Sequence, residues 1–453
     1  MEVIGAKVKN RRDFLQATGM LGVGLVGTSA LLSSCGKKTV NTPLREAGTY
    51  YVPDLADKAE NGKEIKVGIV GCGGRGSGAI ENVFAAADGI TIVAMGDTCA
   101  DRLNGLRDDI RNNHGQEVPE ENCFIGFDAY KKVIDSGIDY VILATPPAFR
   151  PEHYKYAVEK GVHSFLEKPV CVDPKGYRTV MAAAKQAKAK NLVTVCGTQR
   201  HHERQYVEAF QKISEGLIGE ITGGNVYWNQ PMLWYRTREK GWSDMEWMIR
   251  DWVNWTWLSG DHIVEQHVHN IDVFLWMSGL KVKQATGFGS RQRRITGDQY
   301  DNFSVDFECE NGVHFHSMCR QIDGCSSHIG EEIFGTKGYW KGWEETIYDY
   351  DGNVLWQFDW DGERAKHPQF DPYTLEHVDA INHIRKGESL DEATACAMST
   401  LAGIMGRESA YTGQTVTWEQ MSQSEMNLVP ENLQMGPMDM SKYKVPVPGE
   451  EQK

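Results

Sequence analysis

Two patterns of apolar and polar positions divide the chain near residue 198. Before it, short apolar runs alternate with longer amphipathic stretches. The runs predict strands at 66–70, 90–95, 139–144, 162–166 and 192–196. The stretches between them predict helices at 77–87, 100–113, 127–135, 151–160 and 174–189. Such alternation is typical of a doubly wound parallel sheet, which binds its ligand at the carboxyl ends of the strands. We predict this α/β domain at 63–198.

The pattern changes after residue 200, where strand-like runs follow one another with turn signals between them. These runs lie at 220–229, 282–291, 301–309, 312–321, 330–335, 339–342 and 345–350. Short turns between consecutive strands favour antiparallel pairing. A helix is expected at 260–277, and two more, at 374–386 and 391–411, are expected to pack back onto the first domain. We predict a second α/β domain at 199–412, with a large open, mainly antiparallel sheet, and a tail at 413–453.

A glycine-rich turn follows the first predicted strand. In Gly71-x-Gly73-x-x-Gly76, the glycines permit a tight turn, close approach of a pyrophosphate and packing of the next helix. Asp97 ends the second strand, where its carboxylate can bind ribose hydroxyls and repel a 2′-phosphate. This is the fingerprint of a Rossmann domain that prefers NAD to NADP; a plain strand–turn–helix is the alternative. The residues expected to hold the dinucleotide are Gly71, Gly73, Gly74, Arg75, Gly76 and Asp97, together with Thr145, Pro146, Glu167 and Lys168 from two later motifs.

The first 35 residues resemble an export signal. Arg11 and Arg12 precede an apolar run that is too short and too rich in glycine for a membrane span. Leu32-Ser33-Ser34-Cys35 resembles a lipobox, so we expect lipidation at Cys35 and a tether at 36–62. The twin-arginine pathway carries folded proteins, so the protein is expected to be periplasmic or membrane-anchored with its cofactor tightly bound. An ordinary secretory signal is the alternative.

Composition narrows the class of partner. The 453-residue chain has a formal net charge of -14, which argues against nucleic acid because phosphates require basic patches. Nine of the ten cysteines follow Cys35 without the spacing of a disulfide framework, and no C-x-x-C occurs. We therefore expect buried thiols and no zinc knuckle.

Two short motifs follow later strands of the first domain. Thr145-Pro146 leaves the sheet after the strand at 139–144, at the edge where a cofactor would lie. Glu167 and Lys168 follow the strand at 162–166, where a buried charged pair is costly unless it is used. The Lys168 ammonium can stabilise negative charge on a substrate oxygen. Simple turns and a surface ion pair are the alternatives.

A third cluster lies in the predicted helix at 260–277. Glu265 and His269 are four residues apart and would share a helical face, with Asp272 on a similar side. A carboxylate beside an imidazole orients the ring and raises its proton affinity, which suits a general base. His262, Glu265 and His269 could instead hold a metal, but we predict no metal site.

These pieces together resemble the Gfo/Idh/MocA family of NAD(P)-dependent oxidoreductases over residues 64–412. The resemblance implies a Rossmann domain and an α/β domain whose open sheet often mediates oligomerisation, here as a dimer or tetramer. It implies catalytic roles for Lys168 and His269 and places Glu265 where an aspartate is common. His267 stands where a small residue is usual. The segment 196–201 resembles the family's passage between domains, so Arg200 and His201 are expected to face the cleft.

Eight of the 13 tryptophans lie between residues 228 and 276. Core packing is the ordinary explanation for most of them, but aromatic faces also stack on sugars. The residues expected to contact substrate are Arg200, His201, His267, Asp272, Trp234 and Trp252. The predicted function is hydride transfer between a sugar or glycoside carbinol carbon and NAD, with catalysis by Lys168, His269 and Glu265. A redox-neutral glycosidase and a non-catalytic sugar-binding lipoprotein are the alternatives.

Overall fold

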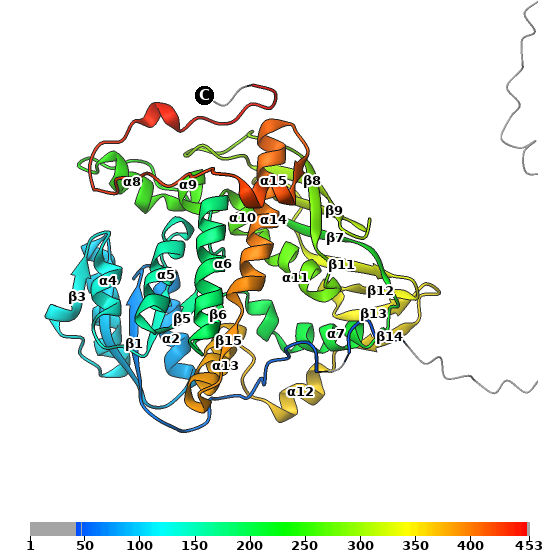
Figure 1. The fold of residues 1–453 in the computed structure, drawn as a ribbon, viewed down its shortest axis with the longest axis horizontal. Helices are drawn as coiled ribbons and strands as arrows, with labels where there is room; N and C mark the ends of the chain where they lie inside the picture. The colour runs from blue at the N-terminus through cyan, green and yellow to red at the C-terminus, as the bar shows by residue number, and fades with distance from the viewer. Residues whose placement is uncertain (1–41, 47, 451–453) are drawn as a thin grey trace, which may run out of the picture. The chain divides into compact units, whose positions relative to one another are not determined.

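The computed structural model describes residues 42–46 and 48–450 (Figure 1). The described residues all belong to one compact unit. The predicted signal at 1–35, with Arg11, Arg12 and Cys35, therefore lies outside the described residues. Within those residues, no helix has both the length and the apolar character needed to cross a membrane.

The first domain contains a parallel sheet of seven strands in the order β15-β6-β5-β4-β1-β2-β3. Its strands are β1 (Ile65–Val70), β2 (Ile90–Asp97), β3 (Cys123–Ile125), β4 (Tyr140–Leu143), β5 (His163–Leu166), β6 (Val193–Cys196) and β15 (Leu390–Asp391). The five predicted strands are confirmed. β3 and β15 are too short to produce an apolar pattern of their own. The segments after β1, β4 and β5 all leave the same edge of the sheet, because these strands are parallel neighbours.

Helices cover both faces of this sheet, as predicted. They are α2 (Gly74–Ala86), α3 (Ala100–His114), α4 (Ala129–Ile134), α5 (Arg150–Lys160) and α6 (Pro174–Ala189). Two later helices return to the first domain, α13 (Pro372–Lys386) against α2 and α14 (Ala393–Thr412) against α6 (Figure 1). α14 also packs on β8 and α11 of the second domain, which explains why nearly all of its residues are buried.

The second sheet has nine strands in the order β14-β13-β12-β11-β7-β10-β9-β8-β16. They are β7 (Ile221–Gln230), β8 (Val282–Ser290), β9 (Asn302–Cys309), β10 (His314–Gln321), β11 (His328–Gly335), β12 (Gly338–Lys341), β13 (Thr346–Asp349), β14 (Val354–Gln357) and β16 (Val416–Thr417). Only the β7–β10 pair is parallel among the ladders described, so the prediction of a mainly antiparallel sheet is confirmed. The remaining helices are α7 (Arg204–Ser214), α8 (Asp244–Arg250), α9 (Thr256–Ser259), α10 (His262–Glu265), α11 (Val268–Ser278), α12 (Trp360–Lys366) and α15 (Trp418–Gln423).

The predicted continuous helix at 260–277 is wrong. It is split into α10 and α11, with Gln266 and His267 between them. The His267 amide donates to the carbonyl of His262, five residues back, and its fully buried ring hydrogen-bonds to Ser317 Oγ at 2.7 Å. These bonds replace the regular spacing of an α-helix. Glu265 and His269 therefore do not lie on one helical face.

Candidate functional site

In the turn after β1, the fold itself requires glycine at the first and last positions, Gly71 and Gly76. Gly71 has φ +98°, and a Cβ there would lie 2.6 Å from the carbonyl carbon of Ala144. A Cβ at Gly76 would lie 1.9 Å from Gly71 O. Backbone contacts this short cannot be relieved by moving a side chain, so both positions exclude any larger residue.

The middle of the same turn is open. A Cβ at Gly73 would meet only Arg102 Cδ, at 3.9 Å, and one at Gly74 would meet nothing within 4 Å. Gly73 has φ -79°, a conformation that any residue adopts. α2 begins here without a side-chain cap and without an acid in its first turn, which leaves amide donors at a positive helix end. The space and the donors fit a pyrophosphate.

Asp97 lies at the end of β2 and is held in place by the backbone. Its carboxylate accepts from the amides of Cys72 at 2.7 Å and Cys99 at 2.8 Å, and the residue is 7% exposed. The exposed part lines the same cleft as Gly73 and Gly74. A carboxylate accepts several hydrogen bonds, so it can also accept from ribose hydroxyls. The negative charge there disfavours a 2′-phosphate, which fits NAD.

The cleft itself has a volume of about 600 Å³. One side comes from the glycine turn, Asp97 and the Thr145-Pro146 segment, and the other from Trp234 and Trp252 of the second domain. The two indole rings pack edge to face, with centroids 6.1 Å apart. Both tryptophans therefore face the dinucleotide cleft. Sequence reasoning did not single out Phe149 or Arg236, which line it too.

Glu167 and Arg75 connect the glycine turn to the end of β5. The Arg75 guanidinium forms an ion pair with the Glu167 carboxylate and lies 4.9 Å from the centre of the Tyr373 ring. A Cβ at residue 197 would lie 2.7 Å from Glu167 Oε2, so Gly197 makes room for this carboxylate. The sequence motif alone gave no sign of this pairing.

Lys168 makes the contact that links the two domains at the end of β5. Its ammonium donates to Glu265 Oε1 at 2.9 Å and to the Glu265 carbonyl at 2.5 Å. The two side chains are only 11% and 6% exposed, so the pair is shielded from solvent. The expected pairing of Glu265 with His269 is wrong, because the break between α10 and α11 turns Glu265 toward Lys168.

His269 is a buried imidazole within reach of the Lys168 charge. Its ring stacks on Trp228 with centroids 5.4 Å apart, and no described residue hydrogen-bonds to it. Burial, followed by the charges of Lys168 and Arg200, lowers the pKa of His269 well below its usual value. The expectation that a carboxylate raises its proton affinity is therefore wrong. A neutral ring with a free nitrogen can accept a proton.

We expect the His269 ring to be neutral at pH 6.5, since a lowered pKa delays protonation until the pH is lower still. Ring ¹⁵N resonances, assigned by their loss in His269→Gln, measure this directly. In Lys168→Met, removal of the neighbouring ammonium should raise the pKa of His269. Protonation of the wild-type ring near pH 6.5, the ordinary value for histidine, would contradict the assignment.

The other residues predicted to contact substrate do not lie together in one site. The Arg200 guanidinium pairs with buried Glu331 at 2.6 Å and lies 5.5 Å from the centre of the Trp228 ring. His201 Nε2 lies 2.6 Å from Asp272 Oδ2, and its ring lines a second, smaller pocket. Asp272 also accepts from Ser399, at 2.7 Å, so it does not support His269 as expected. His267 is fully buried.

The alternative metal set of His262, Glu265 and His269 is not brought together. His262 Nδ1 lies 3.0 Å from Asp261 Oδ1, and Glu265 is engaged by Lys168. Among the described residues, the one group of histidine, cysteine and acidic side chains with metal-ligand spacing lies elsewhere.

Two family models match adjacent parts of the chain. The model described as "Oxidoreductase family, NAD-binding Rossmann fold" matches residues 65–210, and the GFO/IDH/MocA C-terminal domain matches residues 206–341. Together they span more than half of the chain.

Known proteins of similar sequence are distant. The chain is 22% identical over 280 residues to scyllo-inositol 2-dehydrogenase (NAD(+)) of Bacillus subtilis, covering 61% of this chain and 72% of that protein. It is 26% identical over 227 residues to a glycosyl hydrolase family 109 protein of Shewanella baltica, covering 50% of this chain. This chain spans 47% of the length of that hydrolase.

Solved structures share the fold. Apo scyllo-inositol dehydrogenase from Lactobacillus casei superposes with a TM-score of 0.59 at 20% identity, covering 79% of this chain and 99% of that one. The same enzyme with bound NAD(H) and scyllo-inositol gives 0.58. Both matched domains, the glycine turn and the ordered acid at the end of β2 lead to one conclusion: the chain belongs to the Gfo/Idh/MocA family of NAD-binding oxidoreductases.

Proposed function

We propose that the protein oxidises or reduces a hydroxyl-bearing carbon of a sugar or glycoside, using a tightly bound NAD. The observation that carries this proposal is the juxtaposition of Lys168, Glu265 and His269 at the end of β5, the strand edge at which Rossmann domains hold their ligands. When bound, NAD supplies the hydride acceptor or donor for that carbon. The names of the dehydrogenase relatives support a polyol or sugar as substrate.

Three side chains divide the remaining chemistry. The Lys168 ammonium polarises the substrate oxygen and stabilises the negative charge that develops on it. His269 accepts the hydroxyl proton on its free ring nitrogen, which its neutral state makes possible. Glu265 holds the ammonium in place through a side-chain and a backbone oxygen. Trp234 and Trp252 line the cleft that would hold the cofactor.

The direct test is to identify the cofactor by mass spectrometry of the purified protein and then to add a panel of sugars and glycosides. The proposal expects NAD in near-equal amount to protein, and growth of the reduced-nicotinamide absorbance with at least one sugar. Release of an aglycone without net reduction would favour the alternative of a redox-neutral glycosidase; a glycosyl hydrolase family 109 protein is among the relatives. Absence of bound NAD together with failure to take it up would reject both.

Glu265→Gln tests the positioning of Lys168. The amide retains the size of the side chain but loses the charge that fixes the ammonium, so we expect kcat to fall by roughly 100-fold. NAD content and thermal stability should not change. Glu425→Gln, at an exposed acid that pairs with Arg178 at 3.4 Å, is the matched control. An unchanged kcat in Glu265→Gln would remove this residue from the site.

We also propose that copies associate through the open face of the nine-stranded sheet. Phe288, Ser304, Met318 and Tyr227 stand directly opposite one another across four strands, so their side chains form one row on this face. Phe288 is 75% exposed and Met318 is 38% exposed. Phe288→Glu should shift the mass measured by analytical ultracentrifugation from dimer or tetramer toward monomer. A monomeric wild-type protein would contradict the proposal.

Export and anchoring complete the proposed function. Arg11, Arg12 and Cys35 support a folded, cofactor-loaded protein that crosses the inner membrane and is then lipidated. Metabolic labelling with a fatty acid should mark the wild-type protein and not Cys35→Ala. Equal labelling of the two, or none in either, would contradict lipidation at this residue.

A further inference from the structure

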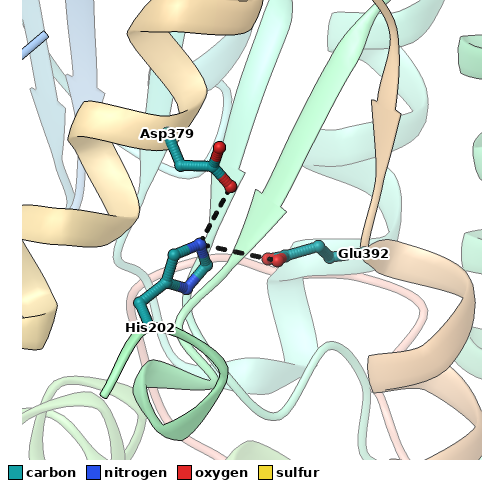
Figure 2. Close-up of side chains that lie close together, drawn as sticks. All are labelled: His202, Asp379 and Glu392. Atoms are coloured by element: carbon teal, nitrogen blue, oxygen red, sulfur yellow. Dashed lines mark hydrogen bonds and ion pairs between the residues drawn. The ribbon is translucent and has the colours of Figure 1, made fainter. Parts of the chain in front are cut away.

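A second cluster of metal-ligating side chains lies outside the proposed catalytic site. His202 ends a short 3₁₀ turn (Gln199–His202), Asp379 lies on α13 and Glu392 caps α14 (Figure 2). Their ligand atoms all lie within 4.8 Å of one another. His202 Nε2 is 3.0 Å from Asp379 Oδ2 and 3.8 Å from Glu392 Oε1. Figure 2 shows both carboxylates on the Nε2 side of the ring.

The spacing fits coordination to a single small cation. Two ligands that each bind a metal at about 2.1 Å in tetrahedral geometry lie about 3.4 Å apart. The two distances from His202 Nε2 fall on either side of this value. His202 Nδ1 has no partner among the described residues, so the ring proton can move there when a cation occupies Nε2.

Burial makes the charge of this cluster costly without a cation. The side chains of His202, Asp379 and Glu392 are 0%, 2% and 9% exposed. The Asp379 and Glu392 carboxylates face the His202 imidazole in the protein interior, and His383 Nδ1 also lies 3.3 Å from Asp379 Oδ1. Glu376, one turn before Asp379 on α13, is also fully buried, and neither of its carboxylate oxygens has a described partner. Excess acidic groups of this kind are stable when a cation neutralises them.

The surroundings supply outer contacts and a route of entry. Tyr51 donates to Asp379 at 2.7 Å, and the Cys196 amide donates to Glu392 Oε2 at 2.8 Å, which orients the Oε1 atom toward His202. Such outer hydrogen bonds are a regular part of metal sites. A pocket of about 240 Å³, lined by Tyr51, His201 and Glu392, reaches the cluster and has room for water.

We propose that His202, Asp379 and Glu392 bind a divalent first-row transition cation, with water from the pocket completing its coordination. One nitrogen and two carboxylate oxygens suit Mn²⁺ and Zn²⁺. The cation fastens α13 and α14 to the junction between the two domains, and Tyr51 adds the N-terminal arm. It has a structural role, separate from Lys168 and His269.

Mn²⁺ is the first probe, because it binds thiols weakly. Free thiols such as the exposed Cys325 could bind Zn²⁺ outside the proposed site. The full-length protein, stripped with a chelator and freed of any tag, is titrated with Mn²⁺ while the free ion is followed by electron paramagnetic resonance. Zn²⁺ then competes for the site. We expect one equivalent bound, displacement by Zn²⁺ and a rise in Tm on loading.

Glu392→Gln keeps the shape of the side chain and should weaken Mn²⁺ binding at least tenfold and abolish the rise in Tm. His114→Gln, at a partly exposed histidine whose Nε2 lies 3.0 Å from Glu81, is the control and should bind as the wild type does. If Glu392→Gln does not fold, Co²⁺ loaded into the wild type must show the ligand-field spectrum of a nitrogen–oxygen site. No bound equivalent in the wild type, or equal binding in Glu392→Gln, would overturn the proposal.

Discussion

Lys168→Met is expected to lower kcat about 1,000-fold while the protein keeps its NAD. The ammonium lies at the end of β5, and its charge acts on His269. Removal of a comparable preorganised donor costs enzymes about 10²–10³ in rate. Methionine fills similar volume without charge, so the fold should persist. Because Lys168 acts on the transition state, KM should change far less than kcat.

Lys175→Met, at an exposed lysine in the first turn of α6, is the control and should behave as the wild type does. Rates should be measured with the same sugar that reduces the bound NAD of the wild type, and NAD content should be determined on each preparation. A Lys168→Met rate within a few-fold of the wild type, with NAD bound, would exclude Lys168 from the chemical step.

Substitutions at two glycines of the same turn, Gly76 and Gly73, are expected to affect folding and cofactor binding separately. Gly76→Ala places a Cβ 1.9 Å from Gly71 O, so we expect a loss of about 3 kcal/mol or more in unfolding free energy. Gly73→Val places its side chain in open space, in a conformation that valine tolerates. The fold should persist in Gly73→Val. Its Kd for NAD should rise roughly 100-fold, because the valine side chain occupies the space of the pyrophosphate; this is a loss of about 2.8 kcal/mol in binding free energy.

Urea unfolding of the NAD-free proteins and titration with NAD distinguish the two outcomes. Gly73→Val with wild-type affinity would show that the phosphates do not approach this turn. Gly76→Ala with wild-type stability would show that the turn adopts another conformation.

Features set by neighbouring residues were predictable from sequence. β1, the glycine turn and β2 form one continuous stretch, and the need for Gly76 arises from its contact with Gly71 within that turn. Most strands of both sheets follow local apolar patterns, but β14 and β16 of the second sheet were not predicted. β3 and β15 follow no such pattern, because two or three residues carry no periodicity, and β15 joins the first sheet only after the chain has built the second domain.

Features set by distant residues were not predictable. The break between α10 and α11 depends on a bond from His267 to Ser317, fifty positions along the chain. That break redirects Glu265 from His269 to Lys168, so the residues of the predicted catalytic group come together while their pairing differs. His202, Asp379 and Glu392 come from three separate segments, and no spacing in the sequence connects them.

The most direct test of hydride transfer follows deuterium from the sugar to the cofactor. A sugar that reduces the bound cofactor is labelled with deuterium at each carbinol carbon in turn, and the NAD is released and weighed by mass spectrometry. The proposed chemistry requires one deuterium on the nicotinamide ring from a single position, with a slowed rate for that substrate and transfer about 1,000-fold slower in Lys168→Met. Turnover of substrate without deuterium ever reaching the cofactor would contradict it.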